Sequence, residues 1–312
     1  MKTQRDHAEK MVTERLRTLG IPHRTAVLLA PYTTFHIGGA ADLFAEPRTE
    51  EELIRTLREA KHAECPVFLL GRGSNVLFSD EGYRGMVICT DSVCGRRAEG
   101  ATLIAACGES LTGLAVFAAK NCLSGMEFCY GIPGSLGGAV CMNAGAYGGE
   151  MSGIVTYADV YDRETDHVRR LCGEELMFSY RESVFLHHPE FTVIKVGMEL
   201  TPQADQVAIH EKMRENMQKR KDKQPLNYPS AGSVFKRPTG AFAGALIEQC
   251  GLKGRRIGDA QVSEKHAGFI VNLGSATAED VTRLIETIVY EVEKQTNIRL
   301  APELQLINSN NG

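Results

Sequence analysis

The chain has 312 residues, of which 43% are hydrophobic and 24% are charged, with a formal net charge of −4. These proportions are ordinary for a folded globular protein and exclude disordered, collagen-like and coiled-coil chains. The charge is also unlike the basic field of duplex-binding proteins, so nucleic acid is not an expected partner.

The first twenty residues predict a polar amphipathic helix over residues 6–19, because isolated apolar residues alternate with charges. They contain neither the apolar core of a signal peptide nor a membrane span, so we expect a cytoplasmic protein without a membrane partner. The nine cysteines are an odd number and include no Cys-x-x-Cys pair. We interpret them as reduced, mostly buried thiols, and we expect no metal site.

The next segment predicts a small α/β subdomain over about 33–85. Residues 33–39 and 41–44 resemble one strand interrupted by glycines, and Thr49 to Glu52 has the spacing of a capping box that opens a helix of about three turns. The apolar run Pro66–Leu70 predicts a buried strand. Together these elements predict a βαβ-like unit over 33–78.

The remaining chain predicts a second α+β subdomain over 86–200 and a third region beyond it. The second subdomain has one convincing helix, at 110–123, and strands at Met86–Thr90, Thr102–Ala106, Ile154–Tyr161 and Thr192–Leu200. After a basic-ended helix at 203–223, prolines break the chain. In the third region, the sequence predicts a helix at 241–250, a strand at Gly268–Asn272 and a helix capped by Thr277 and Asp280. It also predicts a final strand at Glu303–Ile307, where polar and apolar residues alternate.

Two glycine-rich segments stand out as candidate ligand loops. Residues 131–149 hold seven of the 31 glycines, and Gly71–Asn75 directly follows the apolar strand. Glycine allows backbone amides to approach a phosphate closely, so two such loops predict one dinucleotide-sized ligand. The loop Gly71–Asn75 lacks the third glycine of a Rossmann fingerprint and precedes strand-like Val76–Phe78, so a Rossmann fold is not favoured. No P-loop, nucleophile elbow or His-Glu-x-x-His motif occurs.

From about Thr33 to Ile307 the chain resembles the UDP-N-acetylenolpyruvoylglucosamine reductases, or MurB family. The resemblance rests on seven ordered motifs, at Thr34–Gly39, Gly71–Leu77, Gly131–Gly138, Asn143–Gly148, Tyr180–Arg181, Ala231–Lys236 and Pro302–Glu303. It implies an α+β fold: an FAD-binding domain of the vanillyl-alcohol oxidase and p-cresol methylhydroxylase type over 33–200, then an α/β substrate-binding domain over 201–312. Residues 1–32 would form an N-terminal helix ahead of these domains.

The resemblance implies a flavoenzyme that uses FAD and NADPH to reduce UDP-N-acetylglucosamine enolpyruvate to UDP-N-acetylmuramate, a peptidoglycan precursor. A monomer or weak dimer is expected. The residues implied to contact FAD are Gly71, Arg72, Gly73, Ser74, Asn75, Gly131, Ile132, Pro133, Gly134, Ser135, Gly137, Gly138, Asn143, Gly145 and Ala146.

Three residues match the family's catalytic positions. Hydride transfer to the enolpyruvyl double bond leaves negative charge on the substrate carboxylate and a carbon that needs a proton, so the site needs charge stabilisers and an acid. Arg181 matches the guanidinium on that carboxylate, Ser233 the proton donor, and Glu303, expected in the final strand, the carboxylate that works with the arginine. Local sequence alone would favour a surface ion pair, a turn serine and an edge-strand glutamate.

Substrate contacts are less specific in the sequence. The basic run Lys219–Lys223 is suited to attract a diphosphate, and a solvated helix end explains it equally well. The stretch from Arg181 to Leu200 leaves no room for the inserted loop of one subgroup, so the chain resembles the shorter type II form. The candidates are Tyr180, Lys221, Asn227, Lys236, Arg237 and His266, with Gln261 as a weaker one.

Two other functions stay open at the level of sequence. A flavin-dependent oxidase or dehydrogenase of the same superfamily would need a base where this chain offers Ser233, so the residues argue against it. A non-catalytic flavin or nucleotide-sugar binding module is disfavoured because Arg181, Ser233 and Glu303 are all present.

Overall fold

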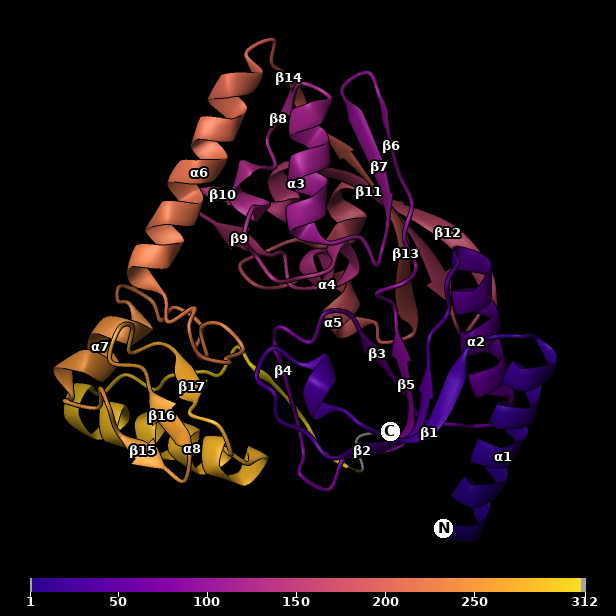
Figure 1. The fold of residues 1–312 in the computed structure, drawn as a ribbon, viewed down its shortest axis with the longest axis horizontal. Helices are drawn as coiled ribbons and strands as arrows, with labels where there is room; N and C mark the ends of the chain where they lie inside the picture. Colours follow the sequence, from indigo (N-terminus) through magenta and orange to yellow (C-terminus); the bar gives the residue numbers. More distant parts are fainter. Residues whose placement is uncertain (1, 310–312) are drawn as a thin grey trace. The chain divides into compact units, whose positions relative to one another are not determined.

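A computed structural model describes residues 2–309, which divide into two compact units, each built from three segments of the chain (Figure 1). Unit 1 comprises Met1–Thr25, Leu43–Arg72 and Gly85–Lys219, and unit 2 comprises Ala26–Asp42, Gly73–Arg84 and Arg220–Gly312. The domain boundaries at residues 32 and 200 stay predictions, because each unit combines three separate segments of the chain.

A five-stranded antiparallel sheet forms the centre of unit 1, in the order β12-β11-β13-β7-β6. Helix α3 (Leu111–Lys120) and the short α4 (Leu136–Cys141) contribute buried apolar residues to the same core as the sheet. The strands predicted at 102–106, 154–161 and 192–200 and the helix predicted at 110–123 are confirmed. The five strands are β6 (Arg96–Glu99), β7 (Thr102–Ala106), β11 (Val155–Asp162), β12 (His167–Cys172) and β13 (Phe191–Glu199).

A second sheet has the order β1-β2-β5-β3 and contains the predicted βαβ segment. Its strands are β1 (His23–Leu28), β2 (Ala40–Ala45), β3 (Val67–Leu70) and β5 (Tyr83–Cys89). Helix α2 (Glu50–His62) joins β2 to β3, and Thr49 Oγ1 accepts a hydrogen bond from the Glu52 amide at 3.1 Å, as its N-cap spacing predicts. The two strands of the predicted βαβ-like unit lie in one sheet but are not neighbours, because β5 lies between β2 and β3 and pairs in parallel with β3.

Two strand predictions in this region need correction. Residues 33–39 are turn and loop rather than strand, because His36 and Gly38 have φ values of 56° and 139°. A Cβ at Gly38 would lie 2.9 Å from Phe78 Cβ, so close packing favours glycine here. Strand β3 begins at Val67, and only its last residue, Leu70, is fully buried, so the run at 66–70 is less buried than its composition predicts.

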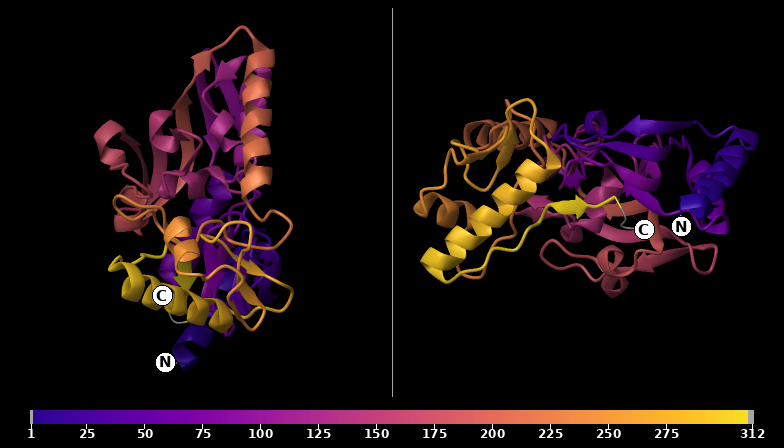
Figure 2. Two further views of the ribbon diagram at one scale, coloured as in Figure 1. Left: turned by 90° about the vertical axis from the view of Figure 1, so that its left-hand side faces the viewer. Right: turned by 90° about the horizontal axis from the view of Figure 1, so that it is seen from below.

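Unit 2 has its own hydrophobic core around helix α8 (Ala278–Thr296). This helix packs against a three-stranded sheet formed by β15 (Arg256–Ile257), β16 (Ala260–Val262) and β17 (Ile270–Asn272), with α7 (Ala243–Gln249) nearby (Figure 2). Thr277 and Asp280 form the predicted capping box through two hydrogen bonds, of 3.0 and 3.1 Å. The strand, the short helix and the long helix predicted for this region are confirmed.

The last strand of the chain is shorter than expected. β18 (Gln305–Ile307) pairs in parallel with β4 (Val76–Phe78), so the strand-like character predicted at 76–78 is confirmed. Glu303 precedes β18, and the prediction that it lies within the strand is wrong, because Pro302 instead forms an isolated bridge with Phe235. Helix α4 inside the glycine-rich segment is an unpredicted element.

The other elements are short or lie at the edges of the units. The N-terminal helix α1 and the helix ending in the basic run, α6, confirm two predictions. No helix among residues 2–309 combines the length and apolar character needed to cross a membrane. The bounds are α1 (Lys2–Thr18), α5 (Val184–His187), α6 (Gln206–Lys223), β8 (Leu123–Ser124), β9 (Gly145–Ala146), β10 (Gly149–Glu150), β14 (Thr201–Pro202), and 3-10 helices at Ala30–Tyr32, Glu127–Cys129, Met151–Gly153 and Gly173–Leu176.

Candidate active site

Within unit 1, Gly71, the first residue of one glycine-rich loop, contacts Ser135 of the other. Gly71 follows β3, and a Cβ at this position would lie 2.2 Å from Ser135 Oγ. Ser135 is the N-cap of α4, and its Oγ accepts a hydrogen bond from the Gly138 amide at 3.4 Å. The contact therefore needs glycine at position 71, and it joins the two loops that the sequence assigns to one ligand.

Both loops present backbone N–H groups without a protein acceptor. Within residues 2–309, the amides of residues 72–75 donate to no protein group, and neither do those of Gly134 and Ser135. In unit 1, the unbonded amides of Arg72, Gly134 and Ser135 offer donors that suit an anion such as the pyrophosphate of a dinucleotide. The residues present therefore fit FAD at these loops.

Other predicted cofactor residues have defined roles in shaping the second loop. Gly131, with a φ of 84°, donates its amide to Thr112 Oγ1 at 3.0 Å, and Gly137 donates to the Cys107 carbonyl at 2.8 Å. Ile132 packs against the core of unit 1, whereas Pro133 is exposed. Sequence reasoning missed Thr112, whose only signal was its position in the first turn of a predicted helix.

Arg72 extends from the first loop and forms an ion pair with Asp91, at 3.0 Å between Nε and Oδ1. The side chain is exposed, so the pair fixes its direction more than it stabilises the fold. Two residues that follow in the same loop, Ser74 and Asn75, are half-buried.

Arg181 lies in a tight turn of unit 1 together with Tyr180. The flanking Ser179 and Glu182 exchange two backbone hydrogen bonds, of 3.1 and 3.2 Å. The guanidinium donates to the carbonyls of Asn143 and Gly145, at 3.4 and 3.2 Å. Arg181 therefore contacts the segment 143–146, which contains the predicted FAD contacts Asn143, Gly145 and Ala146. Tyr180 is exposed, and its ring centre lies 5.3 Å from the Arg181 Cζ.

In unit 2, the segments that carry Ser233 and Glu303 run side by side. The Glu303 amide donates to the Val234 carbonyl at 2.7 Å, and the Lys236 amide donates to the Ala301 carbonyl at 2.9 Å. Asn75 joins them, since its Nδ2 donates to the Glu303 carbonyl at 3.2 Å. The segments that carry Ser233, Glu303 and Asn75 are thus linked by hydrogen bonds in unit 2.

Ser233 borders His266 through Gly268. The Val234 amide donates to the Gly268 carbonyl at 2.9 Å, and a Cβ at Gly268 would lie 3.0 Å from His266 Cε1 and 3.5 Å from Ser233 Oγ. The Ser233 hydroxyl donates to the Phe235 carbonyl at 3.2 Å. Burial lowers the pKa of His266 below its usual value, with Lys253 acting in the same direction, so the imidazole is neutral at pH 7.

The remaining substrate candidates lie mostly at the surface of unit 2. Lys221 and Asn227 are exposed, and the Lys221 carbonyl accepts a hydrogen bond from Lys265 Nζ at 2.5 Å. Arg237 is exposed with its Cζ 4.5 Å from the centre of the Phe242 ring, and Lys236 is half-buried. Gln261 donates to the Gly254 carbonyl at 3.3 Å.

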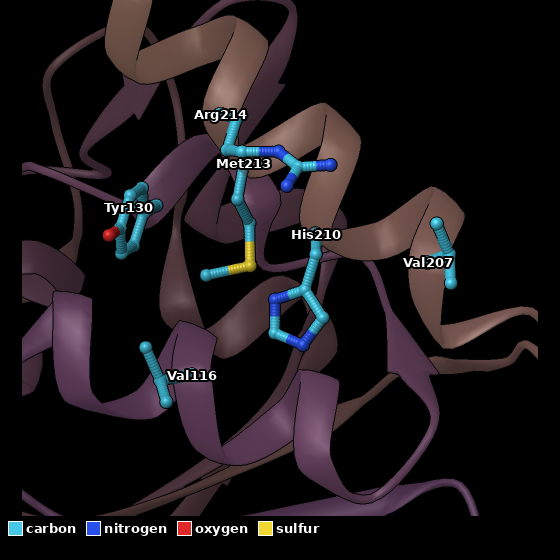
Figure 3. Close-up of a pocket in the computed structure, with 6 residues that line it drawn as sticks. All are labelled: Val116, Tyr130, Val207, His210, Met213 and Arg214. Carbon is cyan, nitrogen blue, oxygen red and sulfur yellow. The ribbon is translucent and has the colours of Figure 1, made fainter.

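An open pocket of about 460 Å³ lies elsewhere in unit 1, between α3 and α6. Figure 3 shows the His210 ring and the Met213 thioether of α6 beside Val116 of α3. Tyr130, Val207 and Arg214 complete its lining, which includes none of the predicted site residues.

Comparison with known proteins agrees with both units. The family model described as the UDP-N-acetylenolpyruvoylglucosamine reductase C-terminal domain matches residues 224–307, and the FAD binding domain model matches residues 41–171. The predicted fold, an FAD-binding domain followed by a C-terminal substrate-binding domain, is thereby confirmed, and FAD is the cofactor named by the model that matches residues 41–171.

Full-length relatives give the same result. The chain is 46% identical to the UDP-N-acetylenolpyruvoylglucosamine reductase of Caldanaerobacter subterraneus subsp. tengcongensis, over 88% of this chain and 90% of the relative. It is 44% identical to that of Clostridium novyi, over 90% and 91%. The crystal structure of the Thermus caldophilus enzyme matches with a TM-score of 0.76 and 36% identity, over 92% and 98% of the two chains. The resemblance in the sequence motifs is confirmed: the chain belongs to the UDP-N-acetylenolpyruvoylglucosamine reductase family.

Proposed function

We propose that this protein reduces the enolpyruvyl double bond of UDP-N-acetylglucosamine enolpyruvate, with NADPH as reductant, to give UDP-N-acetylmuramate and NADP⁺. The double bond gains one hydride and one proton in this reaction. FAD held by the glycine-rich loops would supply the hydride-carrying chemistry between NADPH and the substrate. The protein must therefore hold the cofactor, neutralise the substrate carboxylate and provide the proton.

The glycine-rich loops are the parts of the chain that would hold FAD. The unbonded amides of residues 72–75 and of Gly134 and Ser135 offer hydrogen-bond donors to its phosphates. The contact between Gly71 and Ser135 would hold the unit 1 donors, the amides of Arg72, Gly134 and Ser135, in place before the cofactor binds.

Arg181 would bind the substrate carboxylate. Its guanidinium keeps its charge at all relevant pH values, and its planar array of donors matches a carboxylate in two-point contact. As negative charge builds up on the carboxylate during hydride transfer, this contact strengthens, which lowers the barrier.

Ser233 would give its hydroxyl proton to the carbon next to the carboxylate. A serine hydroxyl is a weak acid, yet the carbanion-like intermediate is a strong base, so a neutral donor held in place suffices. Glu303 would act beside it at the reacting centre. The observation that carries this assignment is the 2.7 Å hydrogen bond from the Glu303 amide to the Val234 carbonyl, which fixes the two segments together.

The cellular setting follows from the same reaction. We propose a cytoplasmic enzyme of peptidoglycan precursor synthesis, on which cell shape and division depend, acting as a monomer or weak dimer on a UDP-sugar. The nine free cysteines fit a reducing compartment.

An anaerobic stopped-flow measurement at the flavin absorbance tests the function. Addition of NADPH should bleach the flavin, and the enolpyruvyl UDP-sugar should then restore its absorbance. A flavin that bleaches but recovers only with oxygen would instead identify an oxidase, and a protein that cannot take up FAD would contradict the proposal as a whole.

A further inference from the structure

The turn that carries Arg181 needs support from outside itself. Arg181 has a φ of 58°, a left-handed conformation that is unfavourable for a residue with a Cβ. The turn is closed by the backbone pair of Ser179 and Glu182. Such strain persists only where surrounding contacts determine the conformation.

Asn143 supports the turn through a side-chain hydrogen bond to Ser179. Its side chain is 1% exposed; Nδ2 donates to the Ser179 carbonyl at 2.9 Å, and Oδ1 accepts from the Ser152 amide at 2.9 Å. The two contacts also fix which end of the amide is which, since the reverse orientation would bring donor to donor and acceptor to acceptor. Both ends of the side-chain amide are therefore used inside unit 1.

The same segment also holds the charged end of Arg181. The Asn143 and Gly145 carbonyls accept from Nη1 and Nη2 of its guanidinium. On the far side of the turn, the fully buried Ser183 donates its hydroxyl to the Cys141 carbonyl at 2.7 Å. Residues 141–145 thus contact the Ser179 carbonyl at the start of the turn, the Ser183 hydroxyl just after it and the Arg181 guanidinium.

We infer that Asn143 is a positioning residue for Arg181, which it aims at the substrate carboxylate through its hydrogen bond to Ser179. The sequence predicts an FAD contact for Asn143, whereas the structure gives both ends of its amide to protein partners. The inference rests on the proposed function, in which Arg181 binds that carboxylate. Displacement of a binding group by about 1 Å is enough to reduce rate by about 100-fold, so a buried positioning contact has kinetic consequences.

Asn143→Asp is the discriminating substitution. The new side chain has nearly the same shape and can still accept from the Ser152 amide, but an ionised carboxylate repels the Ser179 carbonyl. We expect flavin reduction by NADPH to stay within about twofold of the wild-type rate, and reoxidation by the UDP-sugar to slow by about 10- to 100-fold. A protonated carboxyl can donate to Ser179 again, so the loss should shrink as the pH is lowered.

Asn121→Asp is the matched control. Asn121 is an exposed residue of the same unit whose Nδ2 also donates to a backbone carbonyl, that of Phe117, at 2.8 Å. This variant should leave both half-reactions unchanged. If Asn143→Asp does not fold, Asn143→Gly makes the same test, because glycine readily adopts the φ of 40° found here and keeps the backbone carbonyl for Arg181.

Several outcomes would overturn the inference. Equal loss in both half-reactions, a loss in Asn143→Asp that does not depend on pH, weakened FAD binding alone, or failure of both variants to fold would each show that Asn143 serves the fold or the cofactor instead. Arg181→Lys separates this from the proposed function. If that variant reoxidises normally with substrate, the role of Arg181 itself is wrong; if it is slow while Asn143→Asp is normal, only the positioning inference fails.

Discussion

Gly71 and Ser135, 64 positions apart in the sequence, touch so closely that a Cβ on Gly71 would lie 2.2 Å from Ser135 Oγ and 3.2 Å from its Cβ. The same Oγ caps α4 through the Gly138 amide. One contact thus joins Gly71 to the glycine-rich segment 131–149 and also constrains the start of α4, the helix inside that segment.

Gly71→Ala should therefore weaken FAD binding by about 10- to 100-fold, because overpacking of this size costs about 1–3 kcal/mol. Fluorescence titration of the apoprotein with FAD measures the change. Gly153→Ala is the control, since its Cβ would meet nothing within 4 Å. Adding Ser135→Ala to Gly71→Ala removes the closest clash and should recover part of the affinity; a double mutant no better than Gly71→Ala would show that this contact is not the cause.

Ser233→Ala should separate the two half-reactions. Without a proton donor, reoxidation of the flavin by the UDP-sugar should slow by about 1,000-fold, while its reduction by NADPH stays nearly intact. Single-turnover absorbance traces measure both rates. Ser275→Ala, at an exposed serine of the same unit, should change neither. Equal slowing of both half-reactions by Ser233→Ala would remove Ser233 from the role of acid.

Local sequence predicts best where the stabilising contacts are themselves local. The Thr277–Asp280 box and the apolar face of Val281, Leu284 and Ile288 specify α8 within a few residues, and the helix forms as predicted. At Gly38 the deciding neighbour is Phe78, forty positions away, so strand propensity at 33–39 is misleading.

The site shows the same limit. Motifs identify Arg181 and Ser233 as positions, and glycine content identifies both loops. The hydrogen bond from Asn143 to Ser179 joins residues 36 apart, and no spacing rule predicts it. Ser135 caps α4, a helix that the sequence does not predict, because the glycines at positions 137 and 138 have low helix propensity.

Asp80 should contribute to the stability of unit 2 through the N-terminus of α8. Its two carboxylate oxygens accept from the amides of Ala278 and Glu279, at 2.8 and 3.1 Å, in addition to the capping box. Asp80→Ala should lower the free energy of unfolding by about 1–2 kcal/mol, as for the loss of a helix cap. Urea unfolding measures this. Asp80→Asn, which keeps one acceptor oxygen, should lose less, and equal losses would contradict a bonding role for both oxygens.

His266 should make stability depend on pH in the acid range. Burial lowers the pKa of its folded-state imidazole below the usual value of 6.5, so below that pH the unfolded chain binds a proton that the folded chain resists. The stability contribution is thus complete above about pH 6.5 and is lost as the pH falls. Urea unfolding at pH 7.5 and 5.5 should show a smaller acid loss for His266→Gln than for the wild type, with exposed His62→Gln as control. If the free energy of unfolding falls equally in His266→Gln and in the wild type between pH 7.5 and 5.5, the His266 imidazole does not cause the acid destabilisation.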